Sequence, residues 1–368
     1  MIDDDDFLAH GATLTIDLGA LADNWRLLRA RAGEAECAAV VKADAYGVGI
    51  EKAAPALAAA GCRTFFVAHL SEARRARAVD RDAAIFVLNG FPPGSAPLYR
   101  AIGARPVIGA TAEAKEWAAA SDNAPCALHI DTGMNRLGFS MAMLDDPADA
   151  AAIAALNIDV VMTHFVASEV PDDPINAKQI ERFREIMRRF PGKRHSLLNS
   201  SGHFLADAPA GSLTRPGYAL YGGNPTPGKP NPMKPVVGLD AHIVALSEVR
   251  DGERAGYNGL WTAQGKRKLA TISLGYADGV PRNSGGVVDW SGGAALIGGV
   301  PCPFVGSVSM DLIILDVSDA PAGAATRGAP ATIIGGPLTL EAVGAAGRTM
   351  GYEILTSLGK RYRRVYRD

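Results

Sequence analysis

A lysine at position 42 is the first residue in the chain whose setting could support chemistry. It follows Ala38–Val41, a run of small and β-branched apolar residues that indicates a fully buried strand. Burial disfavours the charged form of a lysine and lowers its pKa, which makes the amine suitable for a Schiff base. The alternative is that the long side chain of Lys42 simply carries its charge out to water at the strand end. The lysine alone does not decide between the two.

Polar residues follow four more predicted strands, again where the strand ends. Each has a structural alternative, because a buried asparagine usually completes a turn and a lone histidine usually packs in the core. Five such strand ends are hard to explain by packing, and in a (β/α)8 barrel the chemistry lies at the carboxyl ends of the strands. We therefore interpret Lys42 as part of an active site with these residues: Asp131–Arg136, His164, Asn199 with Ser200, and Arg215.

The segment Arg215–Tyr218 follows the eighth predicted strand and suggests a phosphate site. The loops after strands seven and eight are the usual phosphate site of this fold, where backbone N–H groups surround the anion. Gly217 allows a close backbone approach, and Ser200 can add a hydroxyl. A phosphate near a Schiff-base lysine indicates pyridoxal 5′-phosphate as the cofactor, because its aldehyde requires that amine.

The elements that must position these residues alternate between strand-like runs and alanine-rich helical stretches. Eight strands alternating with helices predict a parallel sheet, and eight is the number that closes a (β/α)8 TIM barrel. A doubly wound open sheet is the alternative, although no GxGxxG motif follows the first strand. The predicted strands are Cys37–Val41, Thr64–Ala68, Ala84–Leu88, Pro106–Ile108, Cys126–Ile130, Ile158–Met162, His195–Leu198 and Ser212–Thr214. The predicted helices include Glu51–Ala60, Ser71–Val79, Thr111–Ala120, Pro147–Leu156 and Asn176–Phe190.

A proline-rich linker divides the chain. Asn224–Pro235 holds five prolines in twelve residues, and the composition changes after it to short strands separated by glycine-rich turns. We expect a barrel over residues 1–230 and a mostly antiparallel β domain over residues 231–368. The strand-like segment Thr13–Asp17 has no partner among the eight barrel strands and could pair with the second domain.

Composition narrows the class of protein. The chain has 368 residues, 48% of them hydrophobic, and a net charge of -2, which argues against disorder and against a basic surface for nucleic acid or membranes. The acidic start MIDDDDFLAH does not resemble a signal peptide. The four cysteines form no CxxC pair, and the histidines have no metal-ligand spacing. We expect a cytoplasmic protein without a metal site.

The chain resembles the alanine racemases, fold-type III pyridoxal-phosphate enzymes, over essentially its whole length. The motifs that carry the resemblance are VVKADAYGVG, DTGMNRLGFS, THF, NSSGHF, TRPGYALYGG, AGYNGLW, SLGYADGVPR, SMD and GYEIL. So many matches in the same order make the resemblance specific.

The resemblance implies a role for each site residue. Lys42 would hold the cofactor covalently, Arg215 would face its pyridine nitrogen, and His164 would pack near the ring while hydrogen-bonding toward Arg215. Asn199 would also belong to the cofactor site. The phosphate would be held by Tyr46, Ser200, Gly217, Tyr218 and Tyr352.

The substrate side of the site is implied in the same way. Arg136 would bind the cofactor's phenolic oxygen and the substrate carboxylate, and the Met310 backbone N–H would bind that carboxylate too. Tyr257 would be the second catalytic base. The resemblance implies that Tyr257, Met310 and Asp311 come from the partner subunit of a homodimer.

The implied activity is interconversion of L- and D-alanine, which supplies D-alanine for peptidoglycan. Racemisation removes a proton from one face of a planar carbanion and returns one on the other, so it needs two opposed bases, here Lys42 and Tyr257. A phenol has a pKa of about 10, so positive charge relayed from Arg215 through His164 must favour phenolate. Without the resemblance, Tyr257 would be interpreted as an edge-strand residue with no catalytic role.

Three positions depart from the family pattern. His129 stands where the family commonly has a lysine, often carbamoylated, whose negative charge holds the neighbouring arginine. A protonated His129 would repel Arg136, so we expect its imidazole to be neutral. Either this imidazole accepts a hydrogen bond from Arg136, or an anion such as chloride fills the gap that the carbamate would occupy. Ser307 stands where an arginine is usual, and Leu312 where glutamine is frequent, which affects the substrate entrance and the dimer contacts.

Two other functions stay open. One is a broad-specificity or serine-preferring racemase with the same machinery. The other, from a different class, is a non-catalytic pyridoxal-phosphate-binding protein, which would resemble the barrel alone and would have no use for Tyr257. A decarboxylase on the same architecture is disfavoured because Tyr257 and Arg215 match the racemase pattern.

Overall fold

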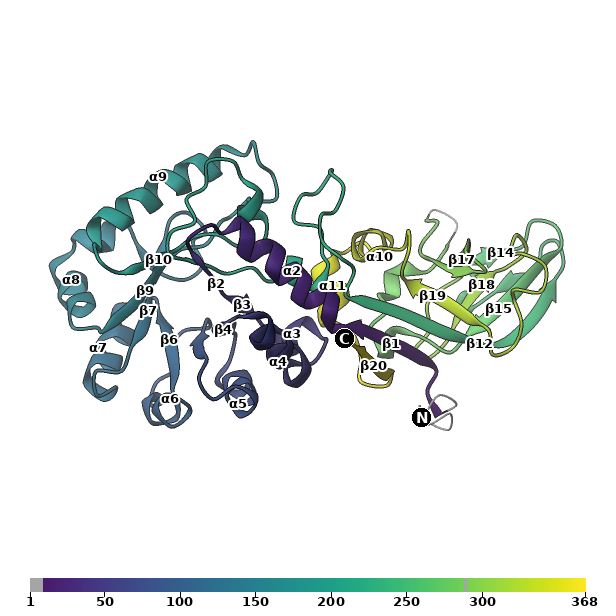
Figure 1. Cartoon of the computed structure of the whole chain (residues 1–368). Coiled ribbons are helices and arrows are strands. Elements are labelled where there is room, and N and C mark those ends of the chain that lie inside the picture. Colours follow the sequence, from purple (N-terminus) through teal and green to yellow (C-terminus); the bar gives the residue numbers. More distant parts are fainter. Residues whose placement is uncertain (1–8, 288–289) are drawn as a thin grey trace. The chain divides into compact units, whose positions relative to one another are not determined.

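The computed structural model describes residues 9–287 and 290–368, and they fall into two compact units (Figure 1). The first unit is Gly19–Lys234. The second combines the chain before Gly19 with Pro235–Asp368. No helix in the described ranges is both long and apolar enough to cross a membrane.

The first unit is a closed barrel of parallel strands, which confirms the predicted fold class. Each strand pairs in parallel with its neighbour from β3 round to β10. The ring closes because β2 pairs with β11, while the Ser212 N–H donates to the His195 carbonyl at 2.8 Å and joins β11 to β10. β2 and β3 are one barrel strand interrupted at Ala38. The strands are β2 (Glu36–Cys37), β3 (Ala39–Val40), β4 (Thr64–Val67), β5 (Ala84–Val87), β6 (Ala104–Ile108), β7 (Cys126–Asp131), β9 (Ile158–Met162), β10 (Arg194–Ser196) and β11 (Leu213–Thr214).

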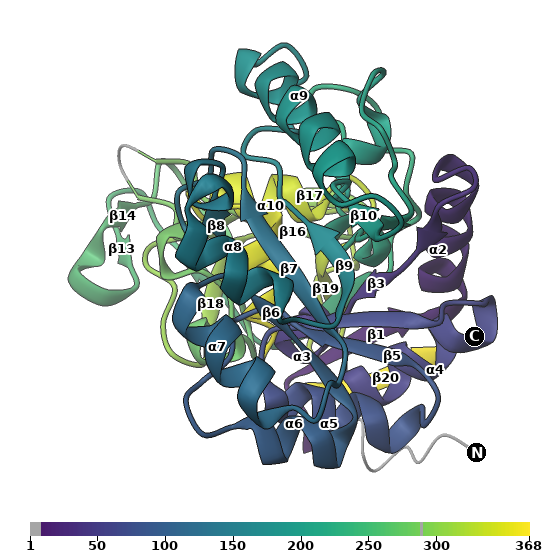
Figure 2. The ribbon, with the colours of Figure 1, turned by 90° about the vertical axis from the view of Figure 1, so that its left-hand side faces the viewer.

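Helices connect successive strands, and Figure 2 shows α4 to α8 following one another around the strands. α6 was not predicted, because its seven residues are too short to show a clear helical period. The helices of this unit are α2 (Leu18–Arg31), α3 (Lys42–Tyr46), α4 (Ile50–Ala60), α5 (Leu70–Val79), α6 (Ala96–Ile102), α7 (Thr111–Ala120), α8 (Pro147–Ala154) and α9 (Pro174–Arg189).

Charged residues join the strands at the amino end of the barrel, opposite the expected site. The Asp159 carboxylate on β9 accepts from Arg194 on β10 at 2.9 Å and from Arg105 on β6. Arg194 also pairs with Glu36 of β2 at 2.8 Å, and Glu36 accepts the hydroxyl of Thr64 on β4 at 2.5 Å. The network therefore ties strands from both sides of the ring.

Replacing Asp159 by alanine should destabilise the barrel measurably. The change leaves the half-buried Arg105 and Arg194 without their shared carboxylate, and we expect a loss of about 2 kcal/mol in the free energy of unfolding. The matched control is Asp145→Ala, which removes a carboxylate 69% exposed and paired to Arg189, and should cost less than about 0.5 kcal/mol. Urea denaturation of both variants measures the difference, and equal losses would contradict the proposed role of the network.

The second unit is a closed antiparallel β barrel with two added strands. β12 (Val237–Val249) pairs with both β19 (Pro330–Ile334) and β15 (Arg267–Ile272), so the order β12-β15-β18-β17-β16-β19 returns to β12. A register shift between Ile243 and Ala245 lets this long strand change neighbours. The remaining members of the ring are β16 (Ala294–Ile297), β17 (Val300–Val305) and β18 (Ile313–Asp316).

The strand near the amino terminus belongs to this second unit. β1 (Ala12–Asp17) pairs antiparallel with β12 and parallel with β20 (Arg363–Arg367). A short hairpin of β13 (Arg254–Ala255) and β14 (Trp261–Thr262) projects from the unit. Two helices complete it, α10 (Leu340–Ala346) and α11 (Gly351–Thr356).

Candidate active site

Lys42 lies two residues after the end of β3 and begins an unusual turn. The next four residues, 43 to 46, all adopt left-handed backbone conformations, with φ between 52° and 57°. None of them is glycine, and for L-residues this conformation costs roughly 1–2 kcal/mol each. Such strain persists only where the surroundings hold it, and it is concentrated at functional sites.

The Lys42 amine is biased toward its neutral form. Its pKa is lowered, chiefly because the half-buried side chain is desolvated and secondly by the positive charge of Arg136, with Glu72 acting in the opposite direction. This environment supports the desolvated interpretation of Lys42 over a lysine whose charge lies in water.

Arg215 follows β11 and is almost fully buried, with 3% of its surface exposed. Its guanidinium donates to the Thr163 carbonyl at 2.6 Å and to the Ser196 hydroxyl, and it lies 5.8 Å from the centre of the Phe66 ring. All three partners are neutral. Burial lowers the pKa of Arg215 to about 9, so the group remains cationic at neutral pH. Within the described residues its hydrogen bonds run to neighbouring strands, and none of them reaches the His164 ring.

Two histidines beside Arg215 are neutral at physiological pH. Burial and the charges of Arg215 and Arg136 lower the pKa of His164, which follows β9, to about 3. The same causes lower the pKa of His129, on β7, to about 4. Lys42 also contributes to the shift at His164, so these five residues share one electrostatic environment at the carboxyl end of the barrel.

The loop after β11 forms a backbone cradle around Ser200. The Ser200 hydroxyl accepts the N–H groups of Gly217 at 3.0 Å and Ala219 at 3.1 Å, which leaves its own O–H to donate to a ligand. Position 217 must be glycine, because a Cβ there would lie 2.4 Å from the Tyr46 hydroxyl oxygen. A serine hydroxyl held in this way can donate to a phosphate group. Tyr218 is buried and begins the short helix after the cradle.

Asn199 contributes mainly to a turn. Its side-chain oxygen accepts the Gly202 N–H and the Ser168 hydroxyl, both at 2.9 Å. The geometry therefore matches the structural alternative for a buried asparagine, and only the amide nitrogen is available to a ligand.

Arg136 lies in a loop that Asp131 shapes. The Asp131 carboxylate accepts three N–H groups, from Gly133 and Met134 at 2.8 Å and from Asn135 at 2.7 Å. Arg136 follows these residues and is exposed, and it lines a hollow of about 260 Å³ together with His129. None of the ion pairs found among the described residues includes Arg136.

The neutral state of His129 can be tested directly. Because the pKa of this ring is lowered to about 4, we expect it to remain uncharged on titration from pH 7 to pH 5, where a histidine with the usual value of about 6.5 gains its proton. Nitrogen-15 NMR of the histidine-labelled protein measures the state, with His129→Gln to assign the signal. An imidazolium at position 129 at pH 7 would contradict the expectation.

Two buried polar residues beside the site, Gln179 and Thr163, were given no role from the sequence. Gln179 on α9 donates to the Thr132 hydroxyl at 2.8 Å and to the His164 carbonyl at 2.9 Å. The Thr132 hydroxyl in turn contacts that of Thr163, the residue whose carbonyl binds Arg215. A signal existed, because Gln179 falls on the buried stripe of an otherwise amphipathic helix with Ile180 and Phe183.

The remaining predicted site residues lie in the second unit. Tyr257 follows β13 and is 72% exposed, and Met310 is 53% exposed. The Met310 loop is fixed by the Ala277 N–H, which donates to the Met310 carbonyl at 3.1 Å. Asp311 pairs with Arg361 at 2.8 Å, and Tyr352 is half-buried on α11.

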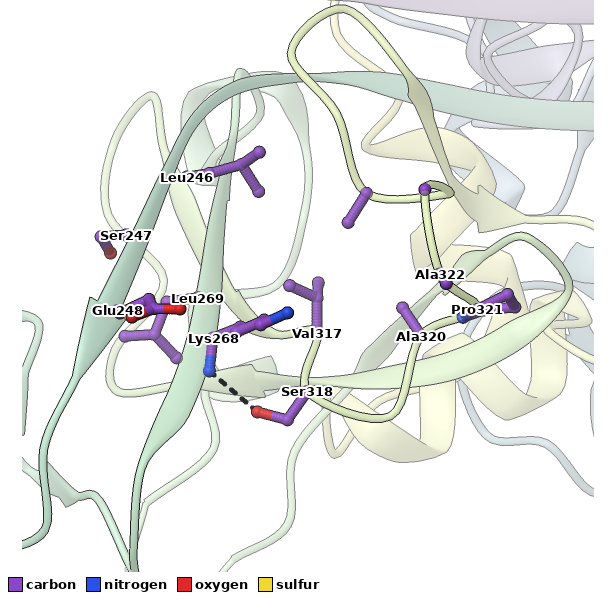
Figure 3. Close-up of a pocket in the computed structure, with 12 residues that line it drawn as sticks. Leu246, Ser247, Glu248, Lys268, Leu269, Val317, Ser318, Ala320, Pro321 and Ala322 are labelled. Atoms are coloured by element: carbon purple, nitrogen blue, oxygen red, sulfur yellow. Dashed lines mark hydrogen bonds between the residues drawn. The ribbon is translucent and has the colours of Figure 1, made fainter.

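A separate hollow of about 420 Å³ lies on the second unit (Figure 3). Its polar lining includes Glu248 and Lys268, which face each other across β12 and β15, and the Lys268 N–H donates to the Ser318 hydroxyl at 2.9 Å. None of the predicted site residues lines it, so we do not assign the active site there.

Fold and site together define a class: a parallel barrel with a half-buried lysine and a loop folded around Ser200 at its carboxyl end, followed by a β domain. The amino-terminal domain model of alanine racemase matches residues 16–225, and the carboxyl-terminal domain model matches residues 236–366. An alanine racemase of Methylobacterium nodulans is 59% identical over 97% of this chain and 96% of its own length.

Solved structures of alanine racemases are also similar to this chain. The crystal structure of alanine racemase from Bartonella henselae with covalently bound pyridoxal phosphate is 35% identical, with a TM-score of 0.90 over 97% of this chain and 99% of that one. The biosynthetic alanine racemase from Pseudomonas aeruginosa is 32% identical, also with a TM-score of 0.90, over 98% and 100%. The chain belongs to the alanine racemase family and is an amino-acid racemase, an isomerase. Alanine racemases depend on pyridoxal 5′-phosphate, so the predicted family, enzyme class and cofactor are confirmed.

Proposed function

We propose that this enzyme interconverts L-alanine and D-alanine by a two-base mechanism and supplies D-alanine for peptidoglycan in the cytoplasm. The observation that carries the proposal is Lys42, a desolvated amine at the carboxyl end of β3 whose pKa is lowered. Bound pyridoxal phosphate acts as an electron sink that makes the α-proton of the amino acid acidic. The chain must then hold the cofactor, orient the substrate and move the proton.

The cofactor is held by the barrel residues described above. The Ser200 hydroxyl, whose oxygen accepts the Gly217 and Ala219 N–H groups, can donate its own proton to the phosphate. Gly217, Tyr46, Tyr218 and Tyr352 complete the phosphate site in this proposal. Asn199 belongs to the same site through its amide nitrogen. Arg215 is cationic, buried and bonded only to neutral groups, so it is suited to donate to the pyridine nitrogen without protonating it. An unprotonated ring delocalises less charge, which suppresses competing reactions.

The substrate carboxylate is bound by Arg136 and by the Met310 N–H, with Asp311 beside it. Arg136 has no carboxylate partner within the described residues and so is available to an anionic group. Lys42 and Tyr257 move the proton: one accepts it at its Nζ or Oη from one face of the α-carbon, and the other donates to the opposite face. The positive charge of Arg215 acts on His164 through space, since it lowers the pKa of that ring, and in this proposal the same charge assists the Tyr257 phenol.

A homodimer completes the site in this proposal. Tyr257 and Met310 are largely exposed within one chain, where water would weaken every interaction with a charged substrate. Other large apolar side chains of the same unit are also exposed, as expected for a surface that a second copy covers. They are Leu260, Tyr276 and Leu312.

A coupled assay tests the proposal. Purified enzyme should convert L-alanine to D-alanine and the reverse, with serine, lysine and arginine as comparison substrates. Higher kcat/KM for serine or for the basic amino acids would favour the broad-specificity alternative. Cofactor binding without conversion of any of them would favour a non-catalytic binding protein, and full activity in a monomer would contradict the shared site.

A further inference from the structure

We propose that Glu72 is a positioning residue that holds the left-handed turn after Lys42 and thereby sets the direction of the lysine amine. This inference rests on the proposed function, in which Lys42 is the reacting amine. Glu72 lies in the first turn of α5, a different element from the lysine, and does not itself touch the reacting atoms.

The geometry points to one particular peptide group. Glu72 Oε1 accepts the Ala43 N–H at 2.6 Å, and that N–H belongs to the peptide joining Lys42 to Ala43. The bond therefore fixes the orientation of the peptide plane on the carboxyl side of Lys42, at the point where the left-handed conformation begins. The other oxygen, Oε2, accepts the N–H groups of Ala68 at 2.7 Å and His69 at 3.1 Å. The carboxylate is thus anchored to the end of β4 on one side and to the turn on the other.

α5 supports the turn at a second point. Arg75, three residues further along the helix, donates to Asp44 Oδ1 at 2.5 Å, and the same oxygen accepts the Ile50 N–H at 3.1 Å. Asp44 is itself one of the left-handed residues. Two contacts from one helix therefore hold a backbone conformation that the sequence ADAY would not adopt alone, since it contains no glycine.

The position of Glu72 also affects the lysine through space. Its negative charge partly opposes the effects of burial and of Arg136 on the Lys42 amine. Glu72 thus influences both the direction and the protonation of the group. The simpler alternative is that Glu72 only caps α5, since it accepts the N–H of His69, the residue before the helix.

The matched control is Glu116 on α7. Glu116 also accepts a loop N–H, that of Gly94, at 2.6 Å, the same length as the bond to Ala43. It contacts no residue of the lysine turn. Glu72→Gln and Glu116→Gln thus remove the same charge and weaken the same kind of bond, but only the first affects the peptide after Lys42.

The test uses the purified holoenzymes and three measurements. For Glu72→Gln we expect kcat for L-alanine to fall about ten- to a hundredfold with KM little changed, because a charge-assisted hydrogen bond that orients the amine is lost. We also expect hydroxylamine to remove the cofactor about tenfold faster, followed by absorbance, since a lysine that is not held in place re-forms its bond more slowly. Thermal midpoints of the two variants show whether each keeps its folded state.

The outcomes separate the alternatives. Wild-type kcat and hydroxylamine rates in Glu72→Gln would overturn the proposal, as would equal changes in Glu116→Gln. If Glu72→Gln fails to fold, Glu72→Asp replaces it; this variant keeps the charge and the cap but is one methylene too short to reach Ala43, and unchanged rates there would refute the role. A wild-type enzyme that releases cofactor slowly but does not racemise alanine would reject the proposed function, while the hydroxylamine comparison would still test Glu72.

Discussion

Replacing Lys42 by alanine should abolish racemisation and the covalent retention of the cofactor together. We expect kcat to fall by at least about a thousandfold, because the change removes one of the two proton-transfer groups and the amine that binds the cofactor. The fall in kcat should be equal for conversion of L-alanine to D-alanine and for the reverse reaction, since Lys42 acts on one face of the same carbon in both. The folded state should survive, because the lysine is only half-buried and its removal relieves the desolvation that lowers its pKa.

The coupled assay and the cofactor absorbance measure this result. Lys193→Ala is the matched control, since Lys193 is an exposed lysine that precedes β10 and so lies at the amino end of the barrel. That variant should keep both activity and absorbance. Conversion of alanine by Lys42→Ala at a rate near wild type would exclude the assignment of the lysine.

Replacing Tyr257 by phenylalanine should separate proton removal on the two faces. We expect racemisation to fall by about 10²–10⁴-fold, the usual contribution of a positioned acid or base. One alanine isomer should still exchange its α-proton with deuterated solvent without inversion, because Lys42 remains on its own face. The cofactor absorbance should be retained. Because the Tyr257 side chain is 72% exposed, the free energy of unfolding of one chain should change by less than about 0.5 kcal/mol.

Proton NMR of alanine in deuterated water measures exchange and inversion at once. Tyr366→Phe is the control, since this tyrosine lies on β20, outside the proposed site. Unchanged racemisation in Tyr257→Phe would refute the two-base scheme. If neither alanine isomer exchanged its α-proton in Tyr257→Phe, Tyr257 would be needed for substrate binding, and its role would not be limited to proton transfer on one face of the α-carbon.

Much of this protein could be inferred from local sequence. Apolar runs such as Ala38–Val41 alternate with helical stretches, which indicates a parallel sheet, and the count of eight strands favours a barrel. A barrel places its chemistry at one set of strand ends, so the positions of Lys42, His164 and Arg215 followed from the strand assignments. The ordered motifs then indicated the family. The predicted fold and family are confirmed, because each was inferred from neighbouring residues.

Other features depend on segments far apart in the chain, and only the tertiary structure decided them. β1 joins β12 and β20, more than two hundred residues away, and nothing in its alternation selects those partners. The pKa of Arg215 and of the two histidines depends on burial by the whole barrel. The left-handed turn after Lys42 is the clearest case. The segment ADAY favours a right-handed helix by propensity. The carboxylate of Glu72, twenty-nine residues after Ala43, accepts the Ala43 N–H and stabilises the left-handed conformation instead. The sequence alone indicated Lys42 as the candidate reacting residue, whereas the conformation of the turn that follows it came from contacts that form only when the chain has folded.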